Sequence, residues 1–151
     1  MATLDILACQ IDIPPTPSAA ARDAHRDATL EKIRSVLSTR HHDLVVLPEL
    51  SSIEYSRESF GNLGELAETL DGPSVQAFSE LAREFNCAVV FGMPRKGDGH
   101  FHIAQVAIEK RHADADLRSI EILGRESQPV IKSRDTLLPS PGVPPTVPVE
   151  R

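Results

Sequence analysis

The sequence contains only two cysteines, no basic stripe and no long apolar run, and each absence removes a class of protein. Cys9 and Cys87 each lie inside an apolar run that predicts a strand, where a cysteine is typically a small buried hydrophobe rather than a disulfide partner or a nucleophile. The net charge is -6 with both signs spread along the chain, which argues against nucleic acid and anionic membrane as partners. No apolar segment approaches the roughly 18 residues of a membrane span, and the N-terminus lacks the pattern of a secretory signal. We therefore expect a cytoplasmic protein about one domain long.

Motifs for phosphate binding, serine hydrolysis and metal binding are also missing. The chain has no glycine-rich phosphate loop, no internal repeat and no Ser-His-Asp arrangement with motif spacing. His100 and His102 form a His-x-His pair on a predicted strand, a pattern that can hold zinc, but no Cys or His cluster supplies further ligands. We interpret this pair as ordinary strand histidines, and the lone His25 and His112 as surface residues. No metal and no cofactor is expected.

The first part of the chain has the pattern of a strand, a helix and a second strand. The mostly apolar run over residues 4–11 ends at a cluster of prolines and predicts a strand. Ser18 can cap a helix over residues 19–39, whose apolar positions recur at helical spacing, with Arg22 and Arg26 on a solvated face. The apolar run over residues 44–47 predicts a buried strand. The length of the crossover implies that the two strands pair in parallel.

Glu49 follows the second predicted strand almost directly. Pro48 cannot donate to a sheet ladder and ends the strand, so Glu49 lies where the chain leaves the sheet. Open α/β folds usually form their sites at this carboxyl edge, which makes Glu49 a candidate for chemistry. These residues alone leave open the alternative that Glu49 is a solvated turn residue.

The rest of the α/β pattern alternates helices and strands. After Glu49 the chain loses periodicity as far as Phe60, in a polar loop that contains Glu54 and Tyr55. The order of elements predicts a layered α/β fold. The later elements are helices over residues 63–70 and from 73 onward, a strand over 87–92 closed by Met93-Pro94, and a strand over 101–108 after a tight turn.

The character of the sequence changes after Ile108. Residues 109–116 are dense in charge without an apolar period, and residues 139–148 hold five prolines, which predict an extended, disordered tail. We therefore divide the chain into an α/β part over residues 1–108 and a divergent, irregular, Pro-rich tail over residues 109–151.

Several segments of the α/β part, taken in order, are similar to one known family. They resemble the N-terminal part of the nitrilase superfamily, the carbon-nitrogen hydrolases, over residues 4–108. This resemblance covers about two thirds of the chain and about two fifths of a full-length family domain. The segments are Ala8-Cys9-Gln10, Leu47-Pro48-Glu49-Leu50, Tyr55, Leu70-Asp71-Gly72-Pro73-Ser74, Val90-Phe91-Gly92-Met93-Pro94 and the strand over 101–108.

The resemblance implies a partial four-layer αββα sandwich and the hydrolysis of small amides, nitriles or N-carbamoyl compounds, without metal or organic cofactor. The family uses a Glu base, a Lys and a Cys nucleophile, and Glu49 matches the base that takes the thiol proton. Tyr55 and Glu54 fall in the pocket loop by resemblance, with Glu54 standing where many relatives have Gly. Relatives usually associate through helices that flank the sandwich, so a homo-oligomer is an option for this chain.

The lysine and the nucleophile of the family have no clear match. Lys110 lies too early, while Lys132 is a candidate that lies late and lacks the aromatic and His context of the family segment. No cysteine follows Cys87, which occupies a small-residue strand position. Our hypothesis is an N-terminal piece of a carbon-nitrogen hydrolase that lacks its nucleophile through truncation or a change of reading frame near Ile108.

Two other hypotheses stay open at this point. In one, the chain is a non-catalytic domain that keeps part of the sandwich for binding or assembly. In the other, it is an active hydrolase with an unusual nucleophile. The last version would pair Lys132 with Ser133 or Ser140, and it needs an activating base in contact with the serine.

Overall fold

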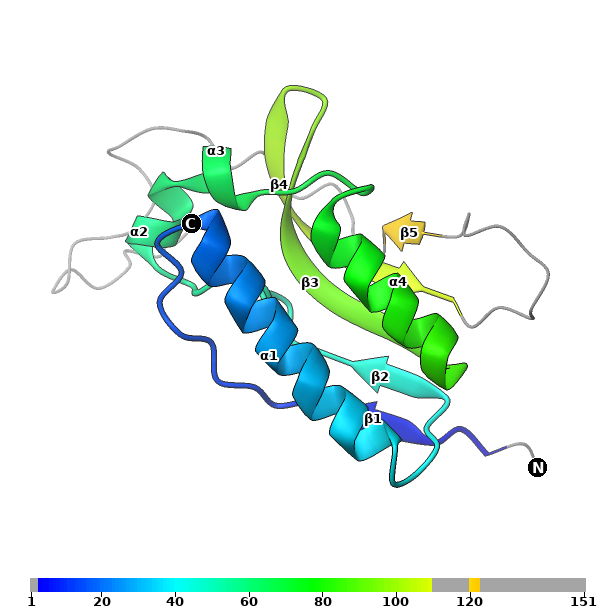
Figure 1. The fold of residues 1–151 in the computed structure, drawn as a ribbon. Helices are drawn as coiled ribbons and strands as arrows, with labels where there is room; N and C mark the ends of the chain where they lie inside the picture. The colour runs from blue at the N-terminus through cyan, green and yellow to red at the C-terminus, as the bar shows by residue number, and fades with distance from the viewer. Residues whose placement is uncertain (1–2, 110–119, 123–151) are drawn as a thin grey trace, which may run out of the picture.

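The computed structural model describes residues 3–109 and 120–122, which form one sheet and a layer of helices (Figure 1). This arrangement confirms the mixed α/β fold expected for part of an αββα sandwich. None of the helices described is long and apolar enough to cross a membrane. The elements are β1 (Ile6–Ala8), α1 (Ala19–Leu37), β2 (Leu44–Val46), α2 (Arg57–Gly61), α3 (Leu63–Leu66), α4 (Pro73–Phe85), β3 (Ala88–Gly97), β4 (His100–Ile108) and β5 (Ile120–Ile122).

The five strands form a single sheet in the order β1-β2-β3-β4-β5. The first three are parallel, with Leu7 opposite Val45 and Val45 opposite Val89, which confirms the parallel pairing predicted from the α1 crossover. Strand β4 runs antiparallel to β3, and β5 runs antiparallel to β4. The predicted hairpin turn is also confirmed, because Asp98 and Gly99 join β3 to β4 with φ angles of 56° and 76°.

Strand β3 continues through Pro94 to Gly97, so the prediction that Met93-Pro94 closes this strand is wrong. Pro94 lies opposite Ile103 of β4, and its carbonyl accepts a 3.1 Å hydrogen bond from the Glu68 N–H on the other side of the strand. The nitrogen and the carbonyl of one strand residue point to the same side, so the missing N–H of Pro94 faces away from β4. A proline placed in this way removes no hydrogen bond from the ladder.

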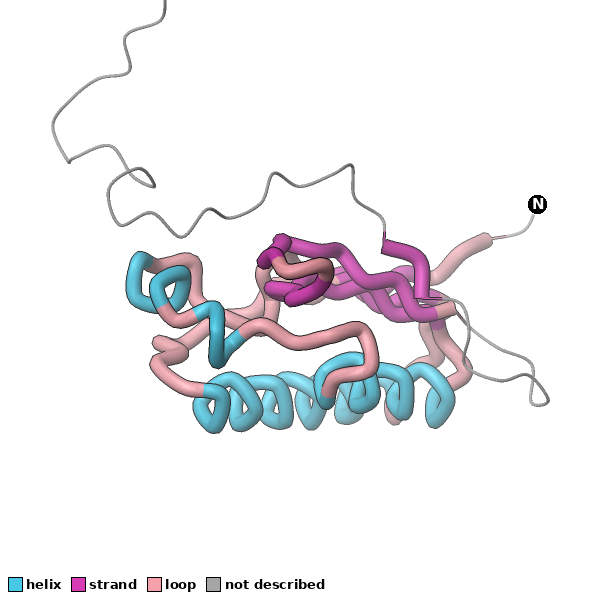
Figure 2. Tube along the Cα trace, turned by 90° about the horizontal axis from the view of Figure 1, so that it is seen from above, coloured by secondary structure: helices cyan, strands magenta, loops and turns pink. Residues whose placement is uncertain are grey.

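The main core lies between the sheet and the layer formed by α1 and α4 (Figure 2). Phe78 of α4 stacks on Phe91 of β3, with ring centroids 4.2 Å apart. Helix α4 begins at Pro73, as predicted. Cys87 is fully buried in this core and Cys9 packs against it, which confirms that both act as small apolar side chains. The side chains that fill the core are Leu30, Ile33 and Leu37 of α1, Val75, Phe78, Leu81 and Ala82 of α4, and Val45, Val89, Phe91, Met93, Val106 and Ile108 of the sheet.

The segment between β2 and α4 differs from its prediction in two places. Helix α2 lies inside the stretch predicted to be irregular, and the Ser56 side chain caps its N-terminus. Helix α3 ends at Leu66, whereas the apolar spacing predicted a helix as far as Leu70. Glu68 leaves the helix because it forms two backbone hydrogen bonds with the edge of β3, one through its N–H and one through its carbonyl. Pairing with the strand edge therefore overrides the helical spacing.

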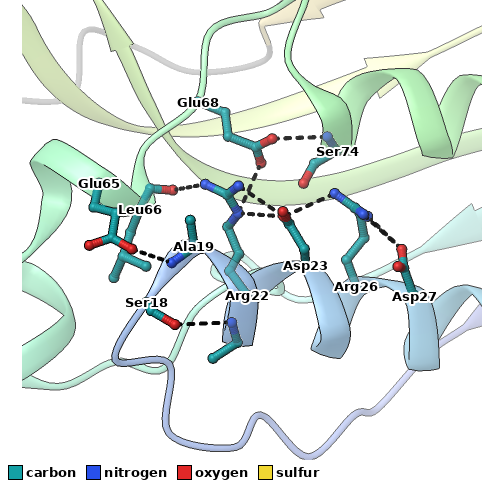
Figure 3. A network of polar contacts seen from close by, with 11 residues as sticks. Ser18, Ala19, Arg22, Asp23, Arg26, Asp27, Glu65, Leu66, Glu68 and Ser74 are labelled. Atoms are coloured by element: carbon teal, nitrogen blue, oxygen red, sulfur yellow. Dashed lines mark hydrogen bonds and ion pairs between the residues drawn. The ribbon is translucent and has the colours of Figure 1, made fainter.

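Arg22 is buried, so the prediction that it faces water is wrong. Its Nη1 donates a 2.8 Å hydrogen bond to the Leu66 carbonyl, its Nη2 donates to Asp23, and its Nε lies 3.7 Å from Oε2 of Glu68 (Figure 3). Glu68 is 4% exposed and accepts a 3.0 Å hydrogen bond from the Ser74 N–H in the first turn of α4. The guanidinium can be buried because a carbonyl and two carboxylates surround its donors. This ion pair joins α1, the segment after α3 and the start of α4.

His25 is buried as well, so its predicted surface position is wrong. Arg22, His25 and Thr29 follow one another at helical spacing and continue the buried stripe of Ile33 and Leu37 toward the N-terminus of α1. Residue type suggested a solvated face for these polar residues, but their position on the helix turns them toward the interior. The N-terminal half of α1 therefore buries polar groups and the C-terminal half buries apolar ones.

The face of the sheet opposite α1 and α4 is apolar and only half-buried. Strand residues alternate between the two faces, so the neighbours of the core residues point to this side. Within the part of the chain that the structure describes, no helix lies over this face (Figure 2). Ile6 is 50% exposed, and Ala8 is exposed beside it. The remaining members, all half-buried, are Leu44, Val46, Ala88, Val90 and Ala107.

We expect Arg22→Ala to destabilise the fold far more than Arg34→Ala. Removing Arg22 leaves the buried Glu68 carboxylate without its cation, which costs about 3–5 kcal/mol of unfolding free energy. Arg34 pairs with Glu84 at 3.0 Å near the surface, where the loss is below about 1 kcal/mol. Urea denaturation followed by circular dichroism measures both values. Equal losses in the two variants would contradict a structural role for the buried pair.

Candidate active site

Glu49 lies in the turn that follows β2, at the carboxyl edge of the parallel strands. Its side chain is exposed, whereas Leu47, Leu50 and Ser51 are buried on either side of it. The backbone of this turn is therefore anchored, while the carboxylate itself is accessible to a small molecule. Such exposure suits a catalytic base and a solvated turn residue equally, so the neighbouring contacts have to separate the two interpretations.

Three hydrogen bonds join the turn to β3 through Ser51 and Gly92. The Ser51 N–H and the Ser51 hydroxyl both donate to the Gly92 carbonyl, at 3.1 Å and 3.0 Å. The Gly92 N–H donates in return to Ser51 Oγ at 3.2 Å. All three bonds are buried, which makes them expensive to break. The turn is thus held to the strand by a closed set of contacts.

Gly92 also provides the space that Glu49 needs. A Cβ placed on Gly92 would lie 1.3 Å from the carbonyl oxygen of Glu49, closer than atoms can approach. Only glycine therefore lets the turn lie against β3. The sequence predicted no role for this residue beyond its place in a strand. A glycine inside a strand pattern often marks the close approach of another backbone, and that signal could have identified Gly92.

Glu54 and Tyr55 lie further along the same segment. The Glu54 N–H donates a 3.0 Å hydrogen bond to the Thr16 hydroxyl, which fixes the backbone, and the Glu54 side chain is half-buried. Tyr55 is 74% exposed and meets Phe60 edge to face, with ring centroids 5.0 Å apart. Among the described residues, no hydrogen bond or ion pair joins either side chain to Glu49. Their place in a substrate pocket stays a prediction.

Comparison with known proteins identifies the family. The sequence matches the carbon-nitrogen hydrolase family over residues 7–137. The chain belongs to the carbon-nitrogen hydrolase family. The match extends past Ile108 and includes the position of Lys132. None of the curated proteins is a significant match to the sequence.

Solved structures share the fold of this carbon-nitrogen hydrolase chain. An N-terminal amidase variant has a TM-score of 0.60 at 17% identity, over 71% of this chain and 25% of that one. Nit3 of Saccharomyces cerevisiae, a member of branch 10 of the nitrilase superfamily, has a TM-score of 0.58 at 20% identity, over 80% of this chain and 44% of that one. A carbon-nitrogen hydrolase superfamily protein of Xanthomonas campestris has a TM-score of 0.53 at 22% identity, over 74% and 42%. The chain thus spans between a quarter and less than half of the length of these proteins.

The other predicted catalytic groups, Lys132, Ser133 and Ser140, lie outside the described residues, with most of the predicted tail. His112, predicted to be a surface residue, lies outside them as well. Burial raises the pKa of the Cys9 thiol, which keeps it protonated and disfavours the thiolate that attacks a substrate. Cys87 is fully buried directly before β3. Among the described residues, neither cysteine is suited to be the nucleophile.

The His-x-His pair has no supporting ligands in the described ranges. His100 is exposed at the start of β4 and His102 is half-buried, with ring centroids 6.3 Å apart. Residues 3–109 and 120–122 bring together no group of three or more His, Cys, Asp or Glu side chains that could hold a metal ion.

We expect Gly92→Ala to disrupt the turn that carries Glu49. The added methyl group overlaps backbone that cannot move aside freely, so the free energy of unfolding should fall by at least about 2 kcal/mol, toward the upper end of overpacking effects. Gly64→Ala is the matched control, because Gly64 lies in α3 with no atom within 4 Å of the added Cβ. That change should be neutral or stabilising by up to about 1 kcal/mol. Thermal and urea unfolding of both variants test the difference, and an unaffected Gly92→Ala protein would show that the close approach is wrong.

Proposed function

We propose that Glu49 is the general base of a carbon-nitrogen hydrolase site that acts on small amides, nitriles or N-carbamoyl compounds. The observation that carries this proposal is the combination of an exposed carboxylate with a backbone fixed by Ser51 and Gly92. A merely solvated turn glutamate does not need an anchored backbone, whereas a base has to be held within a few tenths of an ångström of its partner. Family membership supplies the reaction class.

The chemistry assigned to Glu49 is proton transfer. The carboxylate accepts the proton of a thiol, and the thiolate attacks the carbonyl or nitrile carbon. From an amide or N-carbamoyl compound the nitrogen takes up a proton and leaves as ammonia or an amine, which gives the thioester. From a nitrile the attack gives a thioimidate, which becomes the thioester when one water molecule adds and ammonia leaves. Water then hydrolyses the thioester and regenerates the thiol. A cationic lysine stabilises the charge that develops on the substrate, and Lys132 is the candidate within this sequence.

We propose further that the nucleophile lies outside these 151 residues. Cys9 and Cys87 are packed in or against the core, and no cysteine follows Cys87 in the sequence. The second candidate function is a non-catalytic role in binding or assembly. The half-buried apolar face of the sheet favours it, because contiguous apolar surface of this kind marks contact with other protein.

Turnover assays on simple amides, nitriles and N-carbamoyl compounds test the proposal. The wild-type chain and Glu49→Gln should both show only the uncatalysed rate, because the thiol is missing. If the wild type turns over a substrate and Glu49→Gln does not, Glu49 is the base, but the chain then contains its own nucleophile. Equal catalysed rates in the two proteins would exclude Glu49 chemistry.

The encoding DNA offers an independent test of the missing nucleophile. Reading the other frames beyond the codon for Ile108 should reveal a Lys-His segment and a downstream cysteine, if a change of frame removed them. Their absence from every frame rejects the frame change and leaves truncation or divergence. Size-exclusion chromatography addresses the second candidate function, which predicts a soluble, folded chain and not only aggregate.

A further inference from the structure

His25 contacts the Glu49 turn from the helix layer. It lies in the second turn of α1, is 8% exposed, and places Nε2 3.0 Å from the carbonyl oxygen of Ser51. A carbonyl oxygen can only accept a hydrogen bond, so Nε2 has to carry a proton. The contact therefore requires one tautomer of a neutral ring, or the charged imidazolium.

The contact completes the set of partners around Ser51. Its N–H and hydroxyl bond to Gly92 of β3, and its carbonyl bonds to His25 of α1. Every polar group of this buried residue is thus satisfied, from the sheet on one side and from the helix layer on the other. Glu49 is two residues away, with its own carbonyl in contact with Gly92.

Helix α1 is itself fixed close to His25. Arg22, three residues earlier on the same face, donates to the Leu66 carbonyl and faces the buried Glu68 carboxylate. The donor nitrogen of His25 therefore projects from a part of α1 whose position is already set. A donor on a rigid element can hold a loop more precisely than a donor on a mobile one.

We propose that His25 is a positioning residue for Glu49, acting through the carbonyl of Ser51. Loss of the donor leaves that carbonyl buried and unsatisfied, and the turn gains freedom to move toward water. The Glu49 carboxylate then samples a wider range of positions. The functional part of this inference rests on the proposed role of Glu49 as base. The hydrogen bond between His25 and Ser51 does not depend on that role.

Nuclear magnetic resonance on the complete 151-residue chain tests the proposal through three variants. His25→Leu removes the donor, His25→Gln keeps an N–H₂ group at a similar reach, and His41→Leu is the control at an exposed histidine. The readouts are amide hydrogen exchange at Ser51 and Gly92 and the order parameter of the Glu49 backbone amide. Amide exchange at Leu81 in α4 reports changes that affect the whole fold.

In His25→Leu we expect exchange at Ser51 and Gly92 to rise by about tenfold or more relative to Leu81, together with a lower order parameter at the Glu49 amide. His25→Gln should restore both readouts, and His41→Leu should leave them unaltered. Unchanged exchange and an unchanged Glu49 order parameter in a folded His25→Leu protein would overturn the proposal. A folded His25→Gln protein that behaves like His25→Leu would also overturn it, because donor loss would then not be the cause.

The ring nitrogen shifts of His25 in the wild type give a test that needs no variant. They should show a protonated Nε2 at neutral pH, and an unprotonated Nε2 would overturn the proposal even if His25→Leu fails to fold. These measurements involve no turnover. Equal catalysed rates in the wild type and Glu49→Gln would overturn the role of Glu49 as base and leave the exchange results unaltered. Unchanged exchange in a folded His25→Leu protein would overturn the positioning role alone, so the two proposals fail separately.

Discussion

The carbonyl oxygen of Glu49 occupies the space where any side chain on residue 92 would begin. This close approach lets Ser51 reach the backbone of β3 with both its N–H and its hydroxyl. It also brings the Ser51 carbonyl under α1, where His25 can donate to it. The position of the one candidate catalytic carboxylate therefore depends on the absence of a single Cβ atom. A glycine here serves close packing and not backbone flexibility, since its φ is not in the left-handed region.

A second constraint operates where the helix layer meets the end of the sheet. Arg22 and Glu68 form a buried ion pair that joins α1, the edge of β3 and the start of α4 (Figure 3). Buried ion pairs often add little to stability compared with apolar replacements, but they tolerate few alternative arrangements. This pair therefore helps to determine how α1 lies on the sheet. The orientation of His25, one turn along the helix, follows from that arrangement.

These constraints hold the turn that carries the proposed base, Glu49, within a chain that is similar to only part of its solved relatives. The described residues supply an accessible carboxylate and a rigid backbone, but their two cysteines belong to the core. The apolar face of the sheet opposite α1 and α4 is only half-buried among the described residues, and contact with other protein would remove more of it from water. The proposed catalysis by Glu49 and the proposed contact of the apolar sheet face with other protein are therefore linked.

The sequence by itself determined the elements whose signals are local. Hydrophobic periodicity placed the core strands and α4, the Ser18 cap and the Pro73 start marked two helix N-termini, and the segment around Glu49 indicated the family. Tertiary structure decided where non-local contacts compete with local preference. Glu68 left its helix to pair with β3, and β3 continued through Pro94 because the missing N–H faces away from β4. Arg22 and His25 turned inward because their partners, Leu66, Glu68 and Ser51, come from segments more than twenty residues away in sequence, and no local pattern records such partners.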